Sequence, residues 1–150
     1  MPALNQNLII YDNDTIVLSF TVVDATTTLG STNYAAWWGL ANADNVYDST
    51  ALELEAFSNI TYDVTAGVND CSSNTATQLL SSTLSPSITN YSVNIALTWT
   101  QTNGLSPGDY YHELVLIPRI SAIGHQCRST VAASGILTVE GSMFTNRPYR

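Results

Sequence analysis

The sequence contains no lysine, and its four arginines all lie in the last 32 residues. Residues 1–118 therefore carry a formal charge of −11 and residues 119–150 a formal charge of +3, which together make the −8 of the whole chain. A body this acidic repels phosphate backbones and anionic lipid headgroups, so we expect no binding to nucleic acid or to a membrane surface. The basic end either binds an acidic partner, such as the body of a neighbouring copy, or is a solvated tail.

Cysteine is scarce as well, because Cys71 and Cys127 are the only two and cannot make a disulfide framework. We expect two reduced thiols in a cytoplasmic product, with a single bridge as the alternative if the protein ends up outside a cell. The start, MPALNQNLIIYDND, has neither the basic region nor the apolar stretch of a secretory signal. No hydrophobic run approaches the length of a membrane span, so we expect synthesis and assembly in a cytoplasm.

Motifs of catalysis and of metal or cofactor binding are also missing. There is no glycine-rich phosphate loop and no G-x-S-x-G turn. Asp109, His112 and Glu113 are close in sequence, but strand geometry places His112 and Glu113 on opposite faces. None of the spacings typical of zinc sites occurs among His112, His125, Cys71 and Cys127. We therefore predict a protein that is not an enzyme, with no catalytic residues, no metal and no cofactor.

The residues that are present favour β-strands. Serine and threonine replace the missing charges, and β-branched residues are frequent. Polar and apolar residues alternate over 91–100 and again after the turn at Ser106-Pro107-Gly108-Asp109. Further strands are predicted from apolar runs at residues 7–11, 15–24, 34–41 and 130–140, and Gly39 indicates a bulge or the close approach of another backbone.

The middle of the chain is ambiguous. Residues 41–56 could hold a short helix, because Asp48 or Ser49 could cap a turn through Leu52 and Leu54. Residues 52–64 read equally as two strands around Ser58-Asn59, and we favour strands. Residues 66–77 read as a long polar loop, and residues 85–90 as a turn. Seven or eight short strands with frequent turns predict a single all-β domain, an antiparallel β-sandwich with immunoglobulin-like topology. We assign residues 7–140 to this domain, residues 1–6 to an N-terminal arm and residues 141–150 to an extended C-terminal arm.

The order of several short motifs resembles the small sandwich domain of tailed-phage virion proteins, including the N-terminal domain of the upper baseplate protein family. The matching residues are Asp14, Thr15, Gly108, Tyr110, Glu113, Leu114, Gly135, Leu137, Thr138 and Val139. Family members that carry receptor-binding parts continue past the sandwich into fibre segments, and this sequence stops soon after its last predicted strand. The resemblance therefore implies a structural protein of a bacteriophage virion, most simply a capsid decoration or cement protein that binds the major capsid protein and self-associates on the particle.

Two other functions stay open at this stage. A neck, tail or baseplate adaptor fits the same resemblance, and a carbohydrate-binding module would use tryptophan side chains to stack on sugars. Trp37 and Trp38 are adjacent in a predicted strand, so one is expected in the core and the other at an interface. The C-terminal arm offers further candidate contact residues, which are Met143, Phe144, Arg147, Tyr149 and Arg150.

Overall fold

The alternating segments fold as strands in the computed structural model. It describes residues 4–12, 14–21, 34–42, 52–58, 68–70, 79–80, 84–88, 92–118, 120–122 and 130–141. The elements are β1 (Leu4–Asn5), β2 (Leu8–Tyr11), β3 (Ile16–Thr21), β4 (Tyr34–Asn42), β5 (Leu52–Ser58), β6 (Val68–Asp70), β7 (Ser87–Ile88), β8 (Ser92–Leu97), α1 (Trp99–Asn103), β9 (Gly108–Pro118), β10 (Ile120–Ala122) and β11 (Thr130–Glu140).

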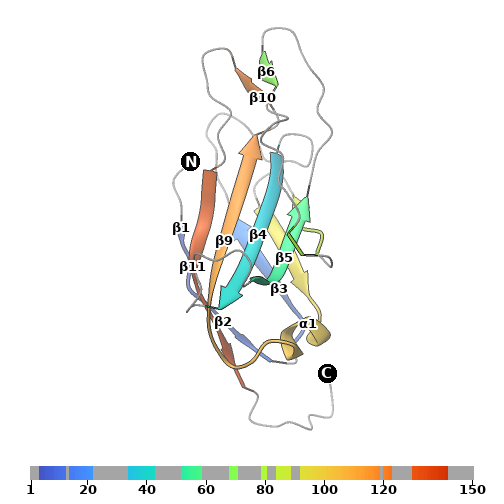
Figure 1. Ribbon diagram of the computed structural model, residues 1–150, viewed down its shortest axis with the longest axis vertical. Coiled ribbons are helices and arrows are strands. Elements are labelled where there is room, and N and C mark those ends of the chain that lie inside the picture. Colours follow the sequence, from blue (N-terminus) through green and yellow to red (C-terminus); the bar gives the residue numbers. More distant parts are fainter. Residues whose placement is uncertain are drawn as a thin grey trace.

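Two sheets pack face to face as a sandwich (Figure 1). The long sheet has the order β1-β11-β9-β4-β5, and β2 also pairs with β11; the short sheet has the order β3-β8-β7. The separate pair of β6 and β10 lies beyond one end of the sandwich (Figure 1). The predicted antiparallel sandwich is thus confirmed, with the addition that β1 and β2 run parallel to β11.

The connectivity is that of an immunoglobulin-like domain of the variable type. The long sheet places β11, β9, β4 and β5 side by side, as the G, F, C and C′ strands are placed, and the short sheet corresponds to B, E and D. The hydroxyl of Tyr110, near the start of β9, donates a 2.8 Å hydrogen bond to the carbonyl of Ser106, which makes a tyrosine corner. Two residues later stands His112, where antibody domains have a cysteine, and its ring lies 5.7 Å from that of Phe20 on β3.

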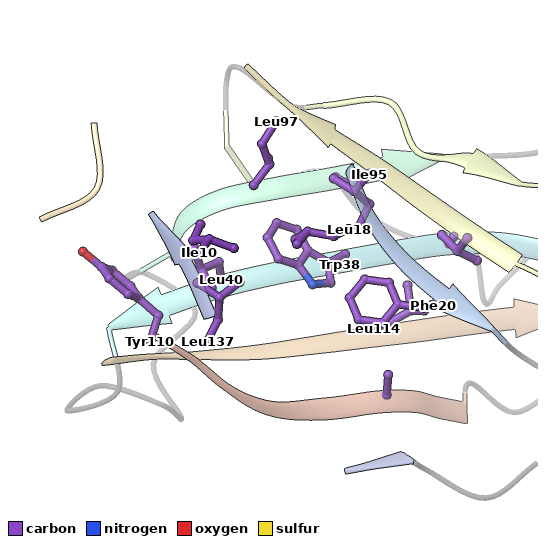
Figure 2. Close-up of a cluster of buried hydrophobic side chains, with 14 of the residues drawn as sticks. Ile10, Leu18, Phe20, Trp38, Leu40, Ile95, Leu97, Tyr110, Leu114 and Leu137 are labelled. Carbon is purple, nitrogen blue, oxygen red and sulfur yellow. The ribbon is translucent and has the colours of Figure 1, made fainter. Parts of the chain in front are cut away.

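The core lies between the two sheets, and side chains from both point into it (Figure 2). Trp38 on β4 is fully buried there, beside Phe20 and Leu18 from the opposite sheet. Within residues 110–116 of β9 the even-numbered side chains face this core and the odd-numbered ones face away, as the sequence predicts. A register shift between Val131 and Ala133 marks a β-bulge, which lets both Ala132 and Ala133 face inward.

Four local predictions are wrong. Residues 4–6 are not a loose arm, because Leu4–Asn5 pairs with β11 and the Gln6 amide donates to the Ser134 carbonyl. Val68–Asp70, within the predicted polar loop, is a strand that pairs with β10. Ser87–Ile88, within the predicted turn, pairs with β8.

The fourth correction concerns Trp99, which the period-two pattern places in a strand. It is the first residue of α1 and is 40% exposed. A capping box explains the change, because the Gln101 side chain accepts hydrogen bonds from the amide and hydroxyl of Thr98 and so favours a helix start. Thr102 fixes this helix to the sandwich, since its buried hydroxyl donates to the Asp14 carbonyl at 2.7 Å.

Candidate functional site

The surface of most interest is the outer face of the long sheet, which is the face turned away from the short sheet. Strand pairing places its side chains in rows that cross β2, β11, β9, β4 and β5. One row contains Tyr11 and Glu140, and the next contains Ile9, Thr138 and Asp109. Further rows contain Ile136, Tyr111 and Ala41, then Ser134, Glu113, Gly39 and Glu55, then Val115, Trp37 and Phe57.

Three apolar side chains at the β2–β11 edge of this face are open to solvent. Ile9 is 63% exposed, Tyr11 48% and Ile136 36%. Ile9 and Ile136 are diagonal neighbours, because Ile9 stands opposite Thr138, two residues along β11 from Ile136. We call these three residues the apolar strip, and their grouping is typical of a surface that another chain covers.

Carboxylates surround the apolar strip. Glu140 is directly opposite Tyr11, and Asp109 accepts a 2.8 Å hydrogen bond from the hydroxyl of Thr138. Glu113 accepts a 3.0 Å hydrogen bond from the hydroxyl of Tyr111. The described part of the chain contains no Lys or Arg, so no described base offsets these charges on the face. The described side chains of this face therefore carry a net negative charge, which favours a cationic partner.

Trp37 lies toward the other edge of the face, in a cluster that the protein itself partly covers. Its indole Nε1 donates to Glu55 Oε2 at 2.5 Å, and the ring packs with Ala35, Phe57 and Val115. A Cβ atom added to Gly39 would lie 2.3 Å from Trp37 Cη2. The close approach expected at Gly39 is therefore that of an indole ring rather than of another backbone.

Glu55 is 1% exposed and organises this cluster. Besides the Trp37 indole it accepts hydrogen bonds from the amides of Leu79, at 2.9 Å, and Leu80, at 2.8 Å. A few residues on, Leu84 pairs with the edge of β5 through both of its backbone groups. Glu55 thus ties the segment before β7 to the long sheet, which is a structural role.

The two adjacent tryptophans point to opposite faces, as the sequence predicts. Trp38 is the core member and has no exposed surface, so it is not available as a contact residue. Trp37 stays the interface candidate of the pair, with its half-buried ring on the outer face. A sugar platform made by all three tryptophans does not form, because Trp38 is buried and Trp99 lies on α1.

His112 is fully buried and its side chain lies on the opposite face from Glu113. His112 Nε2 lies 2.7 Å from the Gln6 carbonyl, to which it donates, and Nδ1 has no hydrogen-bond partner. Burial lowers the pKa of His112, and the bond to Gln6 opposes that shift. The residue therefore holds the N-terminal segment against β9 as a neutral imidazole, and it forms no catalytic group with Asp109 and Glu113.

Other sequence candidates have the following outcomes. No group of three or more His, Cys, Asp or Glu in the described ranges is placed to hold a metal ion. No helix within those ranges is long and apolar enough to cross a bilayer. Several candidate residues lie outside the part of the chain that the structure describes. They are Cys71, His125, Cys127, Met143, Phe144, Arg147, Tyr149 and Arg150.

The apolar strip was not anticipated from the sequence. The motif LIIY at residues 8–11 held the signal, because a strand that is apolar at every position exposes apolar side chains on its second face. Ile136 gave a similar indication between Gly135 and the buried Leu137.

Comparison with known proteins yields likenesses among solved structures. No protein-family model matches the chain, and the search of curated proteins found no relative. A crystal structure of AggA, the major subunit of aggregative adherence fimbriae type I from Escherichia coli, matches with 16% sequence identity and a TM-score of 0.41. The match covers 89% of this chain and 89% of that one.

Proposed function

We propose that this protein is a non-enzymatic structural component of a tailed-bacteriophage virion, in which it acts as a capsid decoration protein that contacts adjacent coat subunits. The observation that carries the protein-contact part of the proposal is the apolar strip of Ile9, Tyr11 and Ile136, set among carboxylates. Apolar and aromatic side chains inside a polar, solvent-accessible rim are the usual composition of a protein interface.

The virion part of the proposal rests on the motif resemblance. Four of the ten motif residues serve the fold: Leu114, Leu137 and Val139 are core residues, and Tyr110 makes the tyrosine corner. Glu113 and Thr138 instead lie on the outer face. The order of the motifs is what supports the choice of protein class, and the composition of the outer face supports the contact surface.

Quantitative mass spectrometry of purified virions tests the proposal by comparing the abundance of this chain with that of the major coat protein. A ratio near one to one supports the decoration function. A few copies per hundred coat proteins would instead indicate a neck, tail or baseplate adaptor. Absence from virions would overturn the proposal, and binding to a glycan array would then be the next measurement.

A binding assay with purified capsids tests the contact surface. We expect the Ile9→Thr/Ile136→Thr variant to bind coat lattices more weakly than the unchanged protein, because it removes apolar contacts and keeps β-branched residues in the strands. Val17→Thr is the matched control, since Val17 is 58% exposed but lies on the outer face of the short sheet. Equal binding by all three proteins would place the coat contact elsewhere.

A further inference from the structure

The described sandwich and the C-terminal segment carry opposite charge. The charged side chains of the described residues are Asp12, Asp14, Glu53, Glu55, Asp70, Asp109, Glu113 and Glu140, all of them acidic. The segment 142–150, SMFTNRPYR, contains Arg147 and Arg150 and no acid. The same chain therefore has an acidic surface and a basic segment of complementary charge.

The side chains of this segment also match the outer face in kind. Met143, Phe144 and Tyr149 are apolar or aromatic, as is the apolar strip that would receive them. Arginine binds carboxylates through paired hydrogen bonds, and each carboxylate has about four lone-pair sites. The single bond from Thr138 to Asp109 leaves most of those sites open for such a contact.

We propose that segment 142–150 of one copy docks on the outer face of a second copy, with its apolar residues on the strip and its arginines near Asp109 and Glu140. This inference deepens the proposed function, since it assigns the apolar strip to a contact between neighbouring copies, which strengthens the binding of many copies to a coat lattice. It rests on that function only for its place on a particle. The contact is heterologous, because a segment of one copy meets a different surface of the next. Repetition of the contact links copies in a row or closes a ring.

The direction of β11 favours a second copy over the chain's own segment. Glu140 is the last residue of β11, and Gly141 follows it at that end of the long sheet. The apolar strip extends from this end back along β11 as far as Ile136. A segment that docked on its own face would have to reverse direction at once, which places Met143 and Phe144 in the turn rather than on the strip. Docking on a second copy requires no such reversal, and nine residues in extended form can span about 30 Å.

The test uses the full chain and a pair of complementary variants. The acceptor-face variant is Ile9→Thr/Ile136→Thr, and the segment variant is Arg147→Ala/Arg150→Ala. Sedimentation velocity over a range of protein concentrations measures self-association of each variant, of the unchanged protein and of an equimolar mixture of the two variants. Val17→Thr is the control for loss of exposed apolar surface outside the proposed contact.

We expect the unchanged protein to self-associate. Each variant alone should self-associate at least about tenfold more weakly. The mixture should regain one contact, because the intact segment of the first variant meets the intact face of the second. Val17→Thr should behave as the unchanged protein, and added salt should weaken the association. Asp109→Asn/Glu140→Gln provides a second acceptor-face variant if the isoleucine substitutions impair folding.

Three results would overturn the inference. These are a monomeric unchanged protein at every concentration, no complex in the mixture, or an equal loss of association in Val17→Thr. A monomer whose segment protects its own Ile9 and Tyr11 amides from hydrogen exchange would show docking within one chain, which also contradicts the second-copy contact. The purified protein is sufficient for this test, so its failure is separate from absence of the protein from virions.

Discussion

At Gly135 the backbone of the N-terminal segment passes very close to β11. A Cβ atom at this position would lie 2.2 Å from the carbonyl oxygen of Gln6. A backbone atom cannot move aside as easily as the end of a flexible side chain can. We therefore expect Gly135→Ala to lower the free energy of unfolding by about 2–4 kcal/mol, measured by urea denaturation. Gly104→Ala is the control, because Gly104 has ordinary helical φ and its nearest neighbour would be 3.5 Å away. A similar loss in both variants would contradict this account.

His112 makes the stability of the fold depend on pH. Burial lowers its pKa in the folded protein below the ordinary histidine value of about 6.5, so the unfolded chain binds more protons in mildly acidic solution. The free energy of unfolding is therefore expected to decrease as pH falls through about 6.5 toward the lower folded pKa. The protonated ring would also hold a buried Nδ1–H without an acceptor.

Urea denaturation at a series of pH values between about 7.5 and 5 measures this dependence on His112. His112→Gln should flatten the curve in that range, because glutamine does not titrate and its amide retains a donor for the Gln6 carbonyl. His125→Gln is the control and should keep the slope of the unchanged protein. An unchanged slope in His112→Gln would assign the dependence to other groups.

At the scale of elements, the edge of β5 depends on a buried carboxylate. Glu55→Ala would leave the Leu79 and Leu80 amides and the Trp37 indole without their acceptor. We expect a loss of about 2–4 kcal/mol in the free energy of unfolding and faster hydrogen exchange at both amides. Glu53→Ala, on the exposed side of the same strand, should change stability by less than about 0.5 kcal/mol. Unchanged exchange at Leu79 and Leu80 in Glu55→Ala would argue against this tether.

At the scale of the whole molecule, the uneven charge predicts opposite effects of salt on folding and on association. The net formal charge of −8 makes the folded chain repel itself, and screening relieves that repulsion. We expect the melting temperature to rise by roughly 2–5 °C between about 20 mM and 0.5 M sodium chloride. Association should weaken over the same range because it relies on opposite charges. A melting temperature that falls with salt would show that net attraction dominates within the fold.

The local pattern of the sequence was enough to predict most strands of the sandwich and the two faces of β9. It was also enough to predict that Trp37 and Trp38 point in opposite directions, since period-two geometry depends on the strand alone. The pattern failed at Leu4–Asn5, Val68–Asp70 and Ser87–Ile88, where strands of two or three residues exist because a distant partner supplies their hydrogen bonds. At Trp99 the capping box prevailed over the alternation that precedes it.

The sequence by itself determined the strand-rich character of the chain, its division into an acidic body and a basic end, and the alternation that separates core from surface. These properties follow from residue types and their spacing. Only the tertiary structure decided that Ile9, Tyr11 and Ile136 meet on one face, because β2 and β11 lie more than a hundred residues apart in the chain. The same holds for the hydrogen bond between His112 and Gln6 and for the one between Glu55 and Leu80. Tertiary packing brings the two members of each pair together, and no local preference of the chain does so.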